Sequence, residues 1–161
     1  MLSKKMESAL NAQINAEFWS AYLYLSMSAH FAGNGLSGFA HWFKHQFKEE
    51  QEHATKFMDY VISRGGTVAL TPIEKVTQSW ASPLAAFEDT LAHEKTVTSL
   101  IHNLVTLANE EKDYATASLL KWYVDEQVEE EGTAQGYVDA LKFIGNDKVG
   151  LYMLNTELGK R

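Results

Sequence analysis

Apolar residues recur at steps of three and four along four long segments of this 161-residue chain, which is the period of an α-helix. The segments span about residues 3–31, 36–64, 82–109 and 113–144. Their boundaries carry residues that begin or end helices. Ser82-Pro83 is typical of an N-cap followed by a first-turn proline, and Asp113 can cap the fourth segment. We therefore expect four long helices, a pattern typical of helical bundles.

The remaining stretches predict how these helices are connected. Residues 67–81 contain Pro72 and no sustained period, and they are too long for a tight hairpin, which indicates a crossover between the second and third helices. Residues 149–158 place three leucines on one side and predict a short fifth helix. The expected fold is all-α and a single domain over residues 1–161, with a four-helix bundle at about 3–145 and the short helix at about 148–158.

Polar residues interrupt the apolar stripe of the second helix. The stripe reads Phe39, Phe43, Gln46, Glu50, His53, Phe57 and Tyr60. Because aromatic residues dominate both ends, the stripe should face the core, and Glu50 and His53 should face it too. A buried carboxylate is costly unless something neutralises it. A carboxylate and an imidazole at positions i and i+3 share one helix face, where a single metal ion would neutralise both.

The polar positions repeat between the two halves of the chain. Glu17 and Glu50 are 33 residues apart (50 − 17), as are Glu94 and Gln127 (127 − 94). A shift of 77 positions (94 − 17) pairs Glu17 with Glu94, Glu49 with Glu126, Glu50 with Gln127, Glu52 with Glu129 and His53 with Glu130. The repeat predicts two helix pairs around a pseudo-two-fold axis. Each pair would offer one carboxylate from its first helix and two polar ligands from its second.

Each of these residues also has an ordinary structural explanation. A single glutamate on an apolar stripe, such as Glu17 or Glu94, is as often a satisfied buried acid as a ligand, and the acidic run 126–131 alone is more often a solvated face. Their joint occurrence at matched spacing favours a metal site, because several buried glutamates would repel one another without a cation. Oxygen-rich ligation with a single histidine suits iron or manganese better than structural zinc or copper.

Composition narrows the classes of function. The net charge of -7 argues against a nucleic-acid partner and suits cations. The chain has no cysteine, which excludes disulfides, iron–sulfur clusters, thiolate zinc sites and cysteine nucleophiles. No run of about 18 apolar residues occurs, so no membrane span is expected, and the default expectation is a cytoplasmic protein.

Over its whole length the chain resembles the ferritin-like di-iron bundles, whose ligands are inward-facing glutamates and Glu-x-x-His motifs. That family pattern has Glu-x-x-His twice. Here it occurs once, as Glu50-Gln51-Glu52-His53, and the matching place on the fourth helix reads Gln127-Val128-Glu129-Glu130. A bacterioferritin would carry the motif at both places, and it would have a haem-ligating methionine where Gln51 stands. The chain therefore resembles a bacterial non-haem ferritin, and we expect no haem.

The resemblance implies roles for particular residues. The implied ligand sets are Glu17, Glu50 and His53 for a first iron; Glu50, Glu94 and Glu130, with Gln127 close by, for a second; and Glu49, Glu126, Glu129 and Glu130 for a third. Tyr24 matches a tyrosine beside the di-iron centre and Trp122 an aromatic residue nearby, although core packing explains both equally well. His45, one turn before Glu49, could add to the third site, but it is also typical of an exposed helix.

The function implied by the resemblance is a ferroxidase that oxidises ferrous iron with dioxygen or peroxide. The ferric oxyhydroxide mineral would be stored in a hollow shell of twenty-four identical subunits. In animal ferritins acidic residues early in the fourth helix line a pore through which iron enters, whereas residues 114–120 contain none. Two alternatives stay open: a discrete di-iron redox enzyme without a cage, such as a relative of the rubrerythrins, and an interaction bundle that binds no metal.

Overall fold

The computed structural model describes residues 1–161 and contains five α-helices and no strand. They are α1 (Lys4–Gly33), α2 (Ser37–Ser63), α3 (Pro83–Glu110), α4 (Tyr114–Ile144) and α5 (Lys148–Leu158). The expected all-α fold is confirmed, and every helix end lies within about two residues of its predicted position, the usual uncertainty of a helix boundary. None of the helices combines the length and the apolar character that crossing a bilayer requires.

Side-chain caps explain where three of the long helices begin. The hydroxyl of Ser3 accepts a hydrogen bond from the backbone N–H of Met6, and Ser82 and Asp113 cap α3 and α4 in the same way. The capping roles expected for Ser82 and Asp113 are thus confirmed. Helix α2 has no such residue next to it in the sequence.

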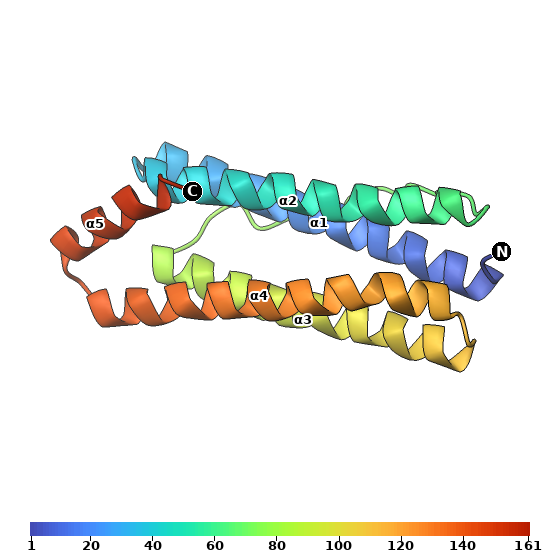
Figure 1. Ribbon diagram of the computed structural model, residues 1–161. Coiled ribbons are helices and arrows are strands. Elements are labelled where there is room, and N and C mark those ends of the chain that lie inside the picture. The colour runs from blue at the N-terminus through green and yellow to red at the C-terminus, as the bar shows by residue number, and fades with distance from the viewer.

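Helix α2 receives its cap from α5. The side-chain oxygen of Asn155 accepts hydrogen bonds from the backbone N–H groups of Gly38, at 2.9 Å, and Phe39, at 3.2 Å. The two backbones approach so closely that a Cβ atom on Gly38 would lie 1.6 Å from the carbonyl oxygen of Asn155. A glycine is required there. This contact fixes α5 across the first turns of α2 (Figure 1).

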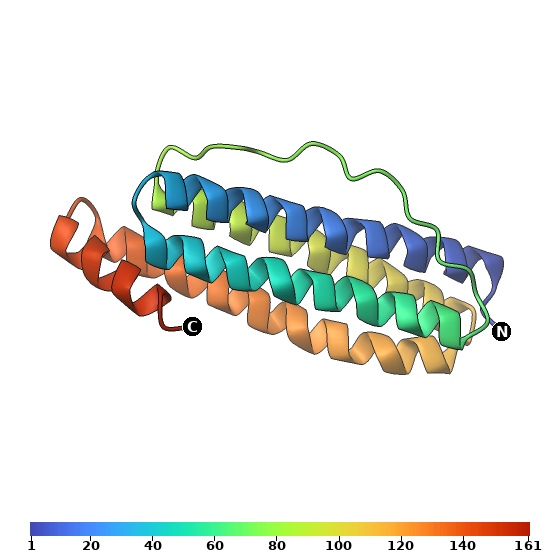
Figure 2. The ribbon, with the colours of Figure 1, turned by 90° about the horizontal axis from the view of Figure 1, so that it is seen from above.

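The four long helices form two antiparallel pairs, α1 with α2 and α3 with α4 (Figure 1). Residues 64–82 cross from the end of α2 to the start of α3 and run along the length of α1 (Figure 2). Side chains of α1 hold this crossover in place: Asn11 accepts from the N–H of Ala69 at 2.7 Å, and Ser26 donates to the carbonyl of Thr77 at 2.6 Å. The crossover lets α3 run in the same direction as α2.

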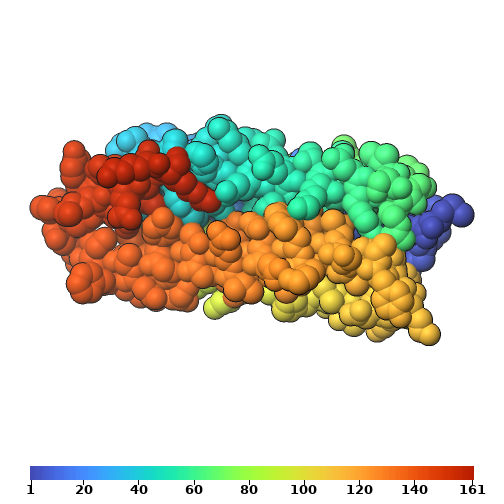
Figure 3. All heavy atoms as spheres, in the orientation of Figure 1, coloured from blue at the N-terminus to red at the C-terminus, as the bar shows by residue number.

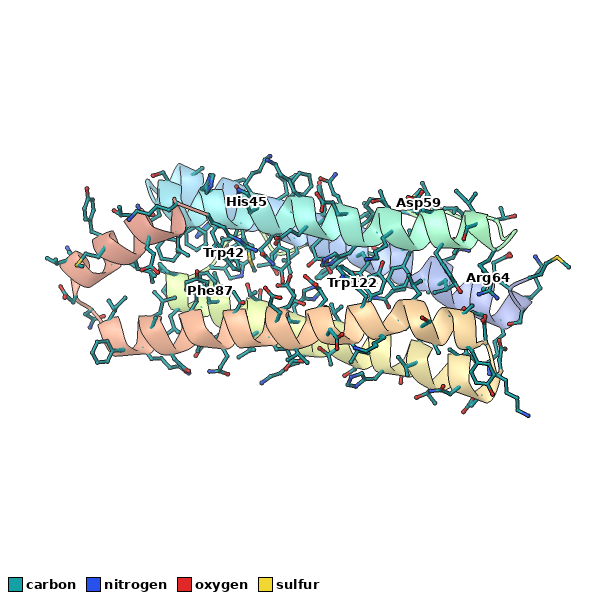
Figure 4. The ribbon with its side chains drawn as sticks, viewed as in Figure 1. Trp42, His45, Asp59, Arg64, Phe87 and Trp122 are labelled. Carbon is teal, nitrogen blue, oxygen red and sulfur yellow. The ribbon has the colours of Figure 1, made fainter.

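Two apolar clusters fill the bundle, one toward each end. The cluster beneath α5 is rich in aromatic residues and includes Phe39, Trp42 and Phe87, the last two of which are labelled in Figure 4. The other cluster lies near the N-terminus and includes Leu10, Phe57, Leu120 and Tyr123. The stripe predicted for α2 is buried from Phe39 to Phe57, whereas Tyr60 at its end is half-buried. Between the two clusters lies a layer of buried polar side chains.

Candidate metal centre

The polar layer draws one or more side chains from each of the four long helices. Its members are Glu17 of α1, Glu50 and His53 of α2, Glu94 of α3, and Gln127 and Glu130 of α4. Each is at most 7% exposed. They occupy core-facing positions of helices that are otherwise apolar, so helical periodicity alone carries them inward. No Cα atom of α2 lies within 8 Å of one of α4, which leaves room for side chains between these two helices.

Glu17, Glu50 and His53 form a group of closely spaced ligand atoms that lies entirely within this layer. One ligand atom from each lies within 4.8 Å of the others, a spacing that lets all three bind one metal ion. The Nδ1 atom of His53 is 3.3 Å from Oε2 of Glu50. Gln13, one turn before Glu17, donates its amide N–H to Oε1 of Glu17 at 2.9 Å. The structure therefore brings together the three residues that the resemblance implies for a first iron.

The other half of the layer is held by hydrogen bonds. The hydroxyl of Tyr24 donates to Glu94, and the amide of Gln127 donates to Oε2 of the same carboxylate at 3.1 Å. Glu130 accepts from the side-chain amide of Gln46 at 2.9 Å. Each of these donors satisfies a carboxylate oxygen that would otherwise be buried without a partner.

Glu130 also belongs to a group that adds His53 to two of the residues implied for a third iron. Its carboxylate, His53 and Glu126 offer three ligand atoms that lie within 4.8 Å of one another. Glu50, Glu94 and Glu130, the set implied for a second iron, share the polar layer but form no group at that spacing. That ligand set stays a prediction.

Burial disfavours ionisation of these carboxyl groups. It raises the pKa of Glu17 to about 7 and that of Glu130 to about 8, in the second case with help from the charge of Glu94. Burial, with neighbouring carboxylates, also raises the pKa of Glu50 well above its usual range. In contrast, burial lowers the pKa of His53 to about 4 and keeps its imidazole neutral, the form that binds metals. A cation would stabilise the ionised carboxylates in this layer.

A second, more exposed acidic group lies at the edge between α2 and α4. It consists of Glu49, Glu126 and Glu129, the residues implied for a third iron. Burial and the charges of Glu129 and Glu49 raise the pKa of Glu126, whose Oε1 lies 3.9 Å from Nε2 of His53. Neither Glu49 nor Glu129 belongs to a group of closely spaced ligand atoms. His45 lies on the same helix but packs against His41, with ring centroids 4.9 Å apart. A third site therefore stays a prediction.

Tyr24 and Trp122 lie beside the polar layer in different ways. Tyr24 is fully buried and reaches Glu94 with its hydroxyl, whereas Trp122 is 37% exposed and lies between α2 and α4 (Figure 4). The ring of Trp122 meets that of His53 edge-on, with centroids 5.4 Å apart. Lys56 places its ammonium group 3.3 Å from the centre of the Trp122 ring.

The sequence analysis missed three polar partners of the site. Gln13 lies on a core-facing position one turn before Glu17, and this spacing was a usable signal. Gln46 also lies on a core-facing position, but its partner Glu130 is on α4, which the spacing within α2 does not indicate. Arg161 donates to Oε2 of Glu49 at 2.7 Å, and no local pattern connects these two residues.

The fold and the site define a class of protein: a four-helix bundle with a carboxylate-rich centre for metal ions midway along its length. Comparisons with known proteins agree with this class and narrow it. A model of the ferritin-like domain matches residues 7–144. The chain is 47% identical to a bacterial non-heme ferritin of Bacteroides fragilis over 161 residues, which is the full length of both proteins. It is 44% identical to one of Staphylococcus saprophyticus, covering all of this chain and 96% of that protein.

Solved structures give the same result. The crystal structure of an open pore ferritin from the archaeon Archaeoglobus fulgidus superposes with a TM-score of 0.99 at 52% identity, covering 100% of this chain and 99% of that one. The chain belongs to the ferritin-like domain family. Membership supports a general function in iron storage and iron oxidation, and the buried carboxylate–histidine group supports metal binding.

Proposed function

We propose that this protein oxidises ferrous iron with dioxygen at a two-iron centre inside the helical bundle. The ferric product is stored as an oxyhydroxide mineral inside a hollow shell of twenty-four subunits. The observation that carries the proposal is the buried group of Glu17, Glu50 and His53, whose ligand atoms lie within 4.8 Å of one another. Its burial and its single neutral imidazole suit ferrous iron better than a structural zinc ion.

The ligands divide between two ions that enter as substrate. Glu17, Glu50 and His53 bind the first. Glu94 and Glu130 bind the second, and Glu50 bridges both, since carboxyl groups of both halves, Glu17, Glu94 and Glu130, are close enough to raise its pKa. For this to happen, Tyr24 and Gln127 must release Glu94, and Gln46 must release Glu130 or share it. The metal-free hydrogen bonds thus keep the second set of ligands satisfied until iron arrives.

The chemistry of the centre is electron transfer from two ferrous ions to one dioxygen molecule. The two ions supply two electrons, and with two protons from the surroundings dioxygen becomes hydrogen peroxide. Anionic oxygen ligands favour the ferric state over the ferrous state, and they thereby promote oxidation. The residues of this chain hold the two ions side by side, so both electrons reach the same dioxygen molecule.

Storage is tested by the ratio of iron to protein. Excess ferrous sulfate is added in air to metal-free protein, the mixture is passed over a gel-filtration column, and iron per chain is counted in the protein peak. A large particle that carries far more iron than its ligands can hold supports a storage shell. Two or three iron atoms per chain in a small particle would instead mean a discrete di-iron enzyme, and no retained iron would contradict both functions.

A matched variant shows whether the stored iron passes through the proposed centre. In His53→Ala the acidic surface is unchanged while one ligand of the first iron is lost. If the centre feeds the mineral, this variant assembles normally but loads iron much more slowly. Because the similar archaeal ferritin is described as open-pored, electron microscopy of the large particle would show in addition whether this chain forms an open or a closed shell.

A further inference from the structure

The C-terminal segment, red in Figure 3, lies against α2. Arg161, which follows α5, contacts the edge of α2 that carries Glu49. Its guanidinium group rests on the ring of Trp42, 4.9 Å from the ring centre, and donates to Oε2 of Glu49 at 2.7 Å. Its carbonyl oxygen accepts from Nε2 of His41 at 2.7 Å. Three residues of α2 therefore hold this one arginine in place.

Arg161 also reaches the buried layer through one intermediate residue. Its second guanidinium nitrogen donates to Oε1 of Gln46, and Nε2 of Gln46 donates to Glu130 at 2.9 Å. A guanidinium group has donors and no acceptor, so it can face only the oxygen of the amide. The Gln46 amide is thereby turned with its NH₂ group toward Glu130. One cationic side chain thus contacts Glu49 directly and orients the donor to Glu130.

We propose that Arg161 forms an ion pair with Glu49 in the metal-free protein, and that a metal ion binding at the acidic edge between α2 and α4 must displace Arg161 from it. Arg161 is a positioning residue under this proposal: it sets how readily the edge accepts an ion beyond the buried pair. The inference rests on the proposed function, since it assumes that the buried centre takes up ferrous iron first.

Lys56 is the natural comparison. It too is a cation resting on a tryptophan beside this edge, with its ammonium group 3.3 Å from the centre of the Trp122 ring. It makes no ion pair with any carboxylate, whereas Arg161 pairs with Glu49. Removing Lys56 therefore removes one positive charge near the edge without freeing a ligand.

The test is a calorimetric titration with ferrous iron under strictly anaerobic conditions at 0.15 M salt, on the wild type, Arg161→Gln and Lys56→Gln. We expect two tight equivalents per chain in all three proteins. Binding beyond these two should be about two- to fivefold tighter in Arg161→Gln, which corresponds to the strength of an exposed ion pair. In Lys56→Gln the gain should stay below about twofold, because salt screens a charge that forms no ion pair with a carboxylate.

A double-mutant cycle shows whether Arg161 acts through Glu49. In a Glu49→Gln background, the Arg161→Gln change should no longer tighten the binding of ferrous iron beyond the first two ions, because Arg161 no longer has a carboxylate at position 49 with which to pair. Near-ultraviolet circular dichroism checks that the aromatic core beneath α5 is intact in each variant. Should Arg161→Gln disturb that core, Arg161→Met provides the test, because its unbranched side chain can still cover the Trp42 ring while it lacks the charge that pairs with Glu49.

The outcomes separate the inference from the function on which it rests. No tight equivalents in the wild type would contradict the proposed function. Two tight equivalents in every protein, with further binding that is equal in the wild type and Arg161→Gln, would overturn the inference alone. Equal gains in Arg161→Gln and Lys56→Gln would overturn it as well, since they would show a general effect of charge rather than displacement.

Discussion

Replacing Glu17 by glutamine should stabilise the metal-free protein at pH 8. The glutamate is 2% exposed, and its ionised form is opposed first by burial and also by the charge of Glu94. Glutamine has nearly the same shape, and its side-chain oxygen can still accept the hydrogen bond that Gln13 donates. The substitution therefore removes the cost of a buried charge while it leaves the packing in place.

The magnitude follows from the shift in pKa. The pKa of Glu17 is raised from 4.5 to about 7 in the folded protein. One unit corresponds to about 1.4 kcal/mol, so ionised Glu17 destabilises the fold by about 3 kcal/mol above pH 7. Below pH 4.5 the carboxyl is protonated in both the folded and the unfolded chain, and the penalty disappears. As the pH rises from 4.5 through 7 the wild type progressively loses this stability, whereas the glutamine variant does not.

The assay is thermal unfolding followed by circular dichroism, with a chelator present, at pH 5 and pH 8. For a domain of this size the expected gain of Glu17→Gln at pH 8 is about 5–10 °C in melting temperature, and at pH 5 it is about 2 °C or less. Glu52→Gln is the control, because Glu52 is exposed and its substitution should change stability little at either pH. A variant less stable than the wild type at pH 8, or one with equal gains at both pH values, would refute the reasoning.

Three further outcomes are expected. His53→Ala should lower the initial rate of iron oxidation at least about tenfold without unfolding the bundle, as measured by stopped-flow absorbance of the ferric product. An unchanged rate would show that His53 is not a ligand. Anaerobic ferrous binding should release protons and tighten as the pH rises from 6 to about 8, because the pKa values of Glu17 and Glu130 are raised to about 7 and about 8; a flat affinity profile across that range would contradict their role as ligands. Asn155→Ala should lower the free energy of unfolding by about 1 kcal/mol, because it removes the cap of α2, and amide hydrogen exchange in α5 should become faster. Unchanged exchange in α5 would show that the cap contributes nothing.

The sequence predicted the features that local patterns determine. Helix positions followed from apolar periodicity and from caps that lie next to the helices they start, such as Ser82 and Asp113. The buried layer followed from polar residues at core-facing positions, and all six of its members are buried as expected. These inferences need only the geometry of one helix at a time and the assumption that apolar faces meet.

Contacts between distant segments could not be predicted in this way. Asn155 caps α2 although 117 residues separate it from Gly38, and the link from Arg161 to Glu49 spans 112 residues. Both depend on how α5 crosses the bundle, which no periodicity encodes. Helix periodicity places Glu126 one turn before Glu130, but it does not predict that His53 of α2 joins them, because this depends on side-chain rotamers and on the donors available to each carboxylate.

The imperfect repeat between the two halves of the chain has a consequence for the proposed chemistry. The shift that relates the two halves makes Gln127 equivalent to Glu50 and Glu130 equivalent to His53. Each half therefore contributes two carboxyl groups and one neutral side chain to the buried layer. When ionised, the four carboxylates balance the charge of two ferrous ions. After oxidation the two ferric ions carry two more positive charges than these ligands, and an uncompensated buried charge is unfavourable. The proposed centre is therefore suited to ferrous iron, and its ferric product is driven to take up hydroxide from water and to leave, as storage requires.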